Sequence, residues 1–301
     1  ATMWRLPSRS AEAAVDVAGR AARDVGVAAP RRPWVDPLPA RVELWTLPPA
    51  EAPGRAAIGW ADRPEEQRRD LLEVDLDRDG GVLVLGAPGA GASTALRTLV
   101  HALRAAGTPL RVHGIDAGTG LAALRGGDVV GDVVPVGDGE RVLRLLRATD
   151  RELRRRMDAG LEAGPGTLRR LLLVDGYGPF EELYERVNRG EAVDLVARIA
   201  RDGRRFGIHV AIAARRRGEV PAALVPSLGL RLDLRCATVD EAALAGLPDG
   251  AADAEVPPGR GHVGGVEVQV ALPSGGAPGE RSARAAPEPV PELPRHVPLA
   301  D

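Results

Sequence analysis

The chain has 301 residues, of which 44% are hydrophobic and 27% charged, and its formal net charge is −2. This is the composition of an ordinary soluble protein, with enough chain for one large or two small domains, and it lacks the basic excess of duplex-DNA-binding proteins, which argues against a nucleic-acid partner. The single Cys236 excludes an internal disulfide and a cysteine zinc site, and no apolar run approaches the roughly 20 residues that cross a bilayer.

Residues 1–57 are predicted to be an N-terminal helix followed by a Pro-rich linker and strand that pack on the core. Residues 10–25 repeat Ala, Val and charged side chains with a helical period. Residues 30–53 are rich in proline, and within them Arg41–Trp45 predicts an edge strand.

Residues 58–273 form the main predicted domain, in which strands and helices alternate. The expected strands are apolar runs at residues 82–85, 110–115, 133–136, 171–174, 209–213 and 230–234. Helix-period segments lie between most of them, at residues 93–106, 140–159, 180–188 and 192–206. Continuous apolar strands separated by helices predict an α/β fold with a mainly parallel sheet and helices on both faces.

The end of the chain differs from this core. Residues 259–270 predict a Gly-rich antiparallel hairpin added at one edge of the sheet. Residues 274–301 are largely Pro, Gly and Ala with scattered charges, a composition that cannot bury enough apolar surface to order itself. They are predicted to be a Pro-rich linker tail toward a following domain.

A glycine-rich loop, residues 86–94, follows the predicted strand at residues 82–85. Gly86 and Gly91 are spaced as in a phosphate-binding P-loop and Ser93 stands where that motif has Ser or Thr, but Ala92 replaces its lysine. The chain contains no lysine, so an arginine would have been needed to keep the charge. A strand, a glycine-rich loop and the N-terminus of a helix, in this order, form a binding site for phosphates. Because Gly and Ala are abundant in this chain, the segment can also be a simple turn. The predicted nucleotide-binding residues are Gly86, Pro88, Gly89, Ala90, Gly91, Ala92, Ser93 and Thr94.

A second apolar strand ends at Asp175, as a Walker B strand ends in an acid. The carboxyl ends of strands are where open α/β sheets bind ligands. Asp175 and Ser93 are therefore predicted to hold Mg²⁺ beside ATP, although an aspartate in this place can also only cap a turn. The next residue, Gly176, can accept no proton from an attacking water, so no catalytic residue is assigned.

Six segments occur in the order and at the spacing of a known family. They are Ile58–Gln67, residues 81–94, Leu171–Asp175, Phe206–Arg215, Pro257–Gly261 and Val268–Pro273. Together they resemble the FtsK/SpoIIIE type of P-loop ATPase domain, and within it a degenerate, downstream ATPase domain of EccC, the motor of type VII secretion. The resemblance implies a RecA-like P-loop NTPase core.

Three departures from the family pattern imply that hydrolysis is weak or absent. Relatives active in hydrolysis have Lys where Ala92 stands and an acid where Gly176 stands. DNA-translocating relatives carry Thr-Gln as a γ-phosphate sensor after the strand that here ends Ala214-Arg215. The degenerate Walker A and Walker B motifs together indicate a domain that keeps its phosphate cradle and has lost turnover.

The resemblance implies a nucleotide-binding, hydrolysis-impaired motor-type domain that acts in regulation, assembly and substrate docking during protein export. Its implied partners are neighbouring ATPase domains of the same motor and small WXG-type secreted substrates, in a ring-forming homo-oligomer of the full-length protein. The implied location is the cytoplasm, at the inner face of the cell membrane. The resemblance implies that the full-length protein holds the domain there and that this segment makes no direct membrane contact.

Two alternatives stay open. One is an active DNA translocase-like ATPase in which another arginine replaces the missing lysine; the nearest, Arg97, lies about 140° around the helix from position 92. The other is a nucleotide-free scaffold. The arginine runs 154–156 and 215–217 could contact nucleic acid or a neighbouring domain, but ion-paired, solvated faces are the commoner use of such runs.

Overall fold

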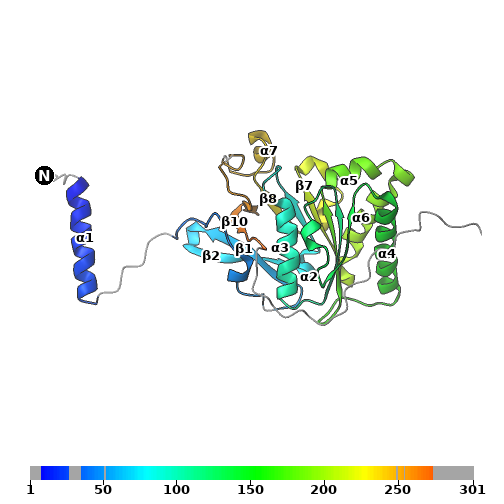
Figure 1. Ribbon diagram of the computed structural model, residues 1–301, viewed down its shortest axis with the longest axis horizontal. Helices are drawn as coiled ribbons and strands as arrows, with labels where there is room; N and C mark the ends of the chain where they lie inside the picture. Colours follow the sequence, from blue (N-terminus) through cyan, green and yellow to red (C-terminus); the bar gives the residue numbers. More distant parts are fainter. Residues whose placement is uncertain (1–7, 27–34, 51, 249, 254, 274–301) are drawn as a thin grey trace, which may run out of the picture.

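The computed structural model describes residues 8–26, 35–50, 52–248, 250–253 and 255–273. This part of the chain contains helix α1 (Ser8–Asp24), as predicted, and a ten-stranded sheet (Figure 1). Among the described helices, none is long and apolar enough to span a membrane. The predicted linker tail at 274–301 lies outside the described residues.

Six strands of the sheet run parallel. Their order is β8 (Leu230–Leu234), β3 (Gly81–Leu85), β7 (Ile208–Ala214), β6 (Arg169–Asp175), β4 (Leu110–Asp116) and β5 (Val130–Pro135). All residues of β3 and β7 are buried, which is why both read as continuous apolar runs in the sequence. The predicted α/β class and its six parallel strands are confirmed.

Four antiparallel strands complete the sheet beyond β8. They are β9 (Arg260–Val263), β10 (Val266–Val270), β1 (Arg55–Arg63) and β2 (Arg68–Asp75), in that order outward. The predicted hairpin is β9–β10, and the sequence analysis missed the β1–β2 hairpin that extends it. A register shift between Ala57 and Gly59 interrupts the alternation of β1, and β2 opens on Arg-Arg-Asp, so neither strand has a clean period of two.

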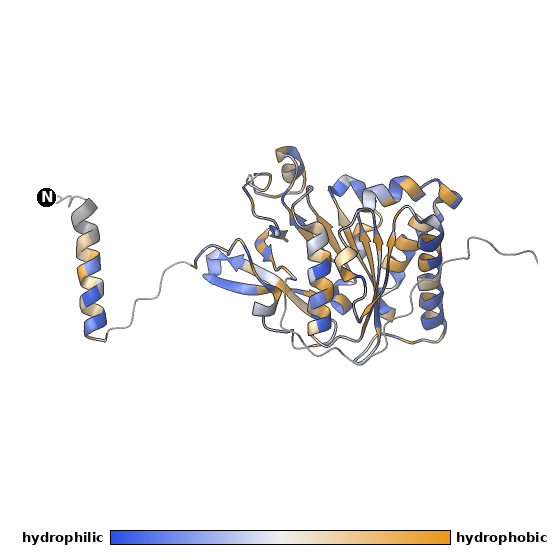
Figure 2. Ribbon diagram, viewed as in Figure 1, coloured by the Kyte–Doolittle hydropathy of each residue, from blue (hydrophilic) through white to orange (hydrophobic). Residues whose placement is uncertain are grey.

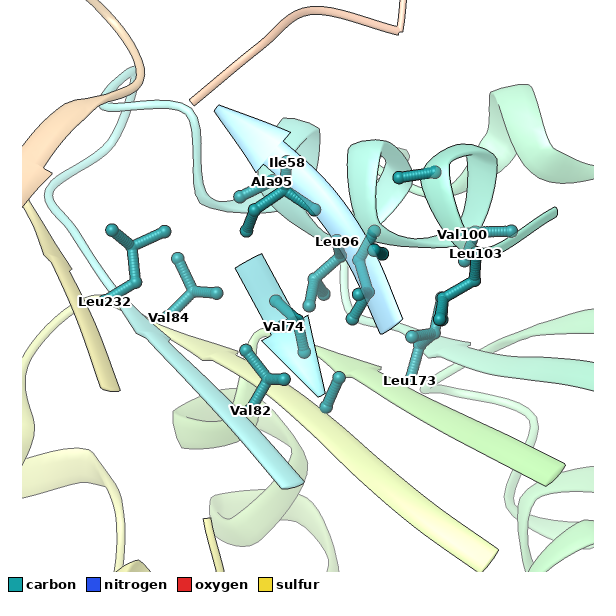
Figure 3. Packing of buried hydrophobic residues seen from close by; sticks show 14 of the residues in the cluster. Ile58, Val74, Val82, Val84, Ala95, Leu96, Val100, Leu103, Leu173 and Leu232 are labelled. Carbon is teal, nitrogen blue, oxygen red and sulfur yellow. The ribbon is translucent and has the colours of Figure 1, made fainter. Parts of the chain in front are cut away.

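Helices cover both faces of the parallel part. One face carries α3 (Ala92–Ala105), and the other carries α4 (Gly139–Asp158), α5 (Tyr177–Tyr184) and α6 (Glu191–Asp202). Alternate residues of β3 divide between the two cores: Val82 and Val84 pack with Leu96 of α3, as Figure 3 shows, while Leu83 and Leu85 pack into the other cluster. Colouring by hydropathy shows the apolar residues gathered on these strands and on the helix faces turned toward them (Figure 2).

Short helical elements join these layers. Two are α-helical, α2 (Leu76–Asp79) and α7 (Val239–Leu244). Seven are 3₁₀ turns: η1 (Leu44–Thr46), η2 (Pro64–Glu66), η3 (Ala122–Leu124), η4 (Val187–Gly190), η5 (Arg204–Phe206), η6 (Arg217–Glu219) and η7 (Val225–Ser227). The predicted helix 180–188 stops at Tyr184 as α5, and Asn188 and Arg189 take left-handed backbone angles with φ of 49° and 61°.

The prediction of an edge strand at Arg41–Trp45 is wrong. The segment makes one isolated bridge, between Glu43 and Leu272, and then turns into η1. Val42 is buried without a ladder, in a small cluster with Leu47 and Ala271, whereas Trp45 stays largely exposed. The proposed domain limits at residues 57 and 273 stay a prediction; β1 runs across the first of them.

Candidate nucleotide site

The glycine-rich loop turns the chain from β3 into α3 at the carboxyl edge of the sheet. The amide of Gly86 donates to the carbonyl of Ala214 at 3.1 Å, and the carbonyl of Ala90 accepts the amide of Gly259 at 2.8 Å. Gly89 and Gly91 have φ of 79° and 104°, angles that side chains rarely tolerate, and Gly91 is the N-cap of α3. The first amides of α3 have no partner within the helix, so the loop presents donors and the positive end of the helix dipole.

A cavity of about 410 Å³ lies in front of these donors, within the size range of small-molecule sites. Seven of the eight predicted nucleotide-binding residues line it, together with Asp175 from the end of β6. The exception is Ala90, which is buried behind the loop. The other lining residues are Ala87, Gly176, Ala213, Ala214, Arg215 and Pro258.

Asp175 and Ser93, the predicted metal ligands, meet in this cavity. Burial raises the pKa of the Asp175 carboxyl, a hydrogen bond with Ser93 opposes the rise, and the charge of Asp116 adds to it. Asp116 ends β4 in register with Asp175 on β6, so the two carboxylates lie side by side. A buried carboxylate beside a hydroxyl is the oxygen pair that Mg²⁺ prefers, and these residues fit the ion.

The loop after β4 forms one wall of this corner. Asp116 holds it by accepting the amides of Gly118 and Leu121, each at 3.0 Å. At Gly120 a Cβ atom would overlap Asp175 Oδ2 and lie 2.5 Å from Ser93 Oγ. The backbone of the loop therefore passes directly over the carboxylate and hydroxyl, and only a glycine leaves both side chains in place.

The structure shows the surroundings of positions 92 and 176, which depart from the motif. Ala92 is the first residue of α3 and brings no charge to the cavity. Arg97, the nearest arginine along the chain, donates to Thr94 Oγ1 at 3.0 Å and does not line the cavity. Gly176 has a φ of 85°, and a Cβ there would come within 2.7 Å of the Cβ of Ala117.

Sequence reasoning missed three participants in this site. Asp116 and Gly120 follow a predicted strand, and the Asp-Ala-Gly-Thr-Gly run was the available signal. For Arg215 the sequence favours a solvated, ion-paired run over contact with nucleic acid or a neighbouring domain, and the structure places this residue in the lining of the cavity. Its place beside Gly86 depends on pairing between β3 and β7, which are far apart in the sequence.

Comparison with known proteins identifies relatives of the whole core. The sequence model of the FtsK/SpoIIIE family matches residues 49–265. The ESX-4 secretion system protein EccC4 of Mycobacterium tuberculosis is 31% identical over 294 residues, covering 88% of this chain and 23% of that protein. The ESX secretion system protein EccC of Thermomonospora curvata is 31% identical over 297 residues, covering 84% and 22%. The chain thus spans less than a quarter of the length of these curated relatives.

Solved structures agree with the sequence relatives. The Thermomonospora curvata EccC structure that contains ATPases 2 and 3 with a signal sequence peptide matches at a TM-score of 0.66 and 28% identity, covering 87% of this chain and 56% of that one. A structure of ATPases 2 and 3 of EssC from Geobacillus thermodenitrificans matches at a TM-score of 0.70 and 21% identity, covering 87% and 55%, which shows the fold alone.

Proposed function

The chain belongs to the FtsK/SpoIIIE family, and from this membership we propose that it is a nucleotide-binding, hydrolysis-impaired motor-type domain of a type VII secretion ATPase. The proposal rests on one observation above the others. The cavity keeps the loop amides and the Ser93–Asp175 corner, while positions 92 and 176 carry neither a cation nor an acid.

The retained residues account for binding. Gly89 and the residues from Gly91 to Thr94 line the space that phosphates need, and Ser93 and Asp175 are the residues that would hold Mg²⁺. Bound Mg²⁺ neutralises phosphate charge. Asp175, a buried carboxylate, is the acid that would hold that ion.

The missing groups account for slow turnover. An attacking water needs a nearby base, and Gly176 offers no acceptor side chain. An acid cannot simply be added there, because the backbone is left-handed and the space is taken by Ala117. The lysine-free loop also lacks the charge that would stabilise the transferring phosphate.

Regulation, assembly and substrate docking form the wider part of the proposal. The EccC and EssC structures above contain two ATPase domains each, and the first was solved with a signal sequence peptide. By likeness, this domain works beside other ATPase domains of one cytoplasmic motor at the inner face of the membrane, in a ring of copies, and docks WXG-type secreted substrates.

Nucleotide titration of the 301-residue protein tests the proposal. With Mg²⁺ present, isothermal titration calorimetry should give a Kd for ATP in the micromolar range or below. Phosphate release should stay below about one per minute, against the roughly 1–10³ s⁻¹ typical of enzymes. Asp175→Asn should abolish the Mg²⁺ dependence of ATP binding, whereas Asp240→Asn, on an exposed turn of α7, should not.

Two results would contradict the proposal. No binding of ATP by folded wild-type protein would leave a nucleotide-free scaffold. Phosphate release at ordinary enzymatic rates would make the domain an active ATPase.

A further inference from the structure

The cavity contains one cationic side chain, and it does not come from the P-loop. Among the described residues that line the cavity, Arg215 is the only arginine, and the chain has no lysine. Arg215 lies next to the loop because Ala214 pairs in register with Leu85, the last residue of β3. The hydrogen bond from Gly86 to the carbonyl of Ala214 ties the start of the loop to the same point.

The position of β7 in the sheet puts Arg215 between the two halves of the site. The order β3, β7, β6 means that the loop follows one neighbour of β7 and Asp175 ends the other. A phosphate chain lying from the loop amides toward the Ser93–Asp175 corner therefore passes the end of β7. Its terminal phosphate would then lie nearest to that corner and to Arg215.

The neighbouring arginines are engaged elsewhere, while the Arg215 guanidinium makes no ion pair within the described part of the chain. The amide of Arg215 donates to Glu219 Oε2 at 2.9 Å, and the same carboxylate pairs with Arg216 at 3.8 Å. Arg217 donates to the carbonyl of Val220 at 2.6 Å. Glu219 thus orders the turn and leaves the Arg215 side chain available.

A second cavity of about 470 Å³ adjoins the first and shares Gly86 and Arg215 with it. Its lining adds Arg216, Arg217 and Arg231, together with Asp233 and Glu241. Asp233 is paired with Arg231 at 2.8 Å, so the excess charge on this side of the loop is positive. A positive flank raises the local concentration of an anion.

We propose that Arg215 supplies, from the end of β7, the positive charge that Ala92 fails to supply from the loop, and that it contacts the terminal phosphate of ATP. The inference rests on the proposed nucleotide binding. It makes Arg215 a binding residue that selects ATP over ADP, because only the triphosphate extends to it. Arg97 donates to Thr94 and does not line the cavity; its charge opposes the rise that burial causes in the pKa of the Asp175 carboxyl.

Affinities of the 301-residue protein and of two variants test this assignment. Arg215→Ala should weaken ATP binding about 10- to 100-fold, as expected for one hydrogen bond to a charged group, and should weaken ADP binding far less. Arg186→Ala removes an arginine whose side chain is 91% exposed and which lines neither cavity, and it should change neither affinity more than about twofold. Unliganded melting temperatures should be equal for the three proteins.

A double variant shows whether Arg215→Ala weakens ATP binding because a charge is lost or because the loop is distorted. If Arg215 replaces the lysine of the motif, then Ala92→Lys in the Arg215→Ala background should restore most of the ATP affinity. Equal ATP affinity of wild type and Arg215→Ala would overturn the assignment and leave the proposed function standing. Failure of wild-type protein to bind any nucleotide would overturn both.

Discussion

At position 92 this loop carries alanine, where the P-loop motif has lysine. Ala92 opens α3, is half-buried, and packs at the margin of the core formed by Leu96 and its neighbours. Its backbone already has helical geometry, so a longer side chain needs no change of conformation there. The cavity in front of it is open to solvent and has room for a flexible chain.

Ala92→Lys should tighten ATP binding about tenfold or more, because an ammonium group in the cavity adds a charge-assisted contact to phosphate. The same variant should not release phosphate faster than about one per minute, since Gly176 still offers no base. Calorimetry and a phosphate-release assay measure the two effects. Fast turnover from this one change would show that an acid at position 176 is not needed.

At the scale of elements, α2 connects the β1–β2 hairpin to the amino ends of the parallel strands. Arg169, the first residue of β6, is only 2% exposed and donates twice to Asp77 of α2, at 3.0 and 2.6 Å. Arg204 donates to the Asp77 carbonyl at 2.8 Å, and His209 bonds the carbonyl of Gly80 at 2.9 Å. One short turn therefore joins β2, β6 and β7 at the edge opposite the site.

Asp77→Asn should lower the free energy of unfolding by roughly 2–3 kcal/mol, because Arg169 would remain buried without a counter-charge. The value lies below that of a fully buried pair since the Asp77 side chain is 42% exposed. Asp202→Asn breaks a more exposed pair with Arg201 and should cost less than about 1 kcal/mol. Urea unfolding measures both; equal losses would show that Arg169 gains little from Asp77.

The strands that are plainest in the sequence, β3, β6 and β7, are almost wholly buried. The strand at residues 81–85 reads as apolar because helices cover both of its faces, and Gly91 marks the start of α3. The segment 41–45 was predicted to be a strand, but it makes one bridge, and of its side chains only Val42 is buried, in a small cluster. In the site, the loop was predictable because it is continuous in sequence, whereas Arg215 reaches it only through strand pairing.

At the scale of the whole molecule, buried histidines make stability depend on pH. Burial lowers the pKa of His113 and of His209 to about 4, from 6.5. Burial also lowers the pKa of His101 and His262. The unfolded chain therefore binds protons at a higher pH than the folded chain does, and acid favours unfolding as pH falls through 6.5 toward 4.

Between pH 7 and pH 5 the free energy of unfolding should fall, by about 2 kcal/mol for each of His113 and His209. Burial also raises the pKa of the Asp175, Glu181 and Asp233 carboxyl groups, so any proton that they bind in the folded protein opposes the loss of stability. The comparison of wild type with a histidine variant therefore isolates the histidine contribution. Urea unfolding at pH 7, 6 and 5 measures the slope, and His113→Gln should make it shallower. A slope that His113→Gln leaves unchanged would mean that this imidazole gains protons as readily in the folded protein as in the unfolded one.

The backbone at Gly176 restricts which residues could replace this glycine. A left-handed φ of 85° and an Ala117 Cβ only 2.7 Å from where a new Cβ would lie mean that a single substitution to an acid lands in a strained, crowded place. An acid at position 176 therefore needs a second change, at position 117, that makes room for its Cβ. Neither substitution alone places an unstrained carboxylate beside Asp175, so the two positions are expected to vary together rather than one at a time.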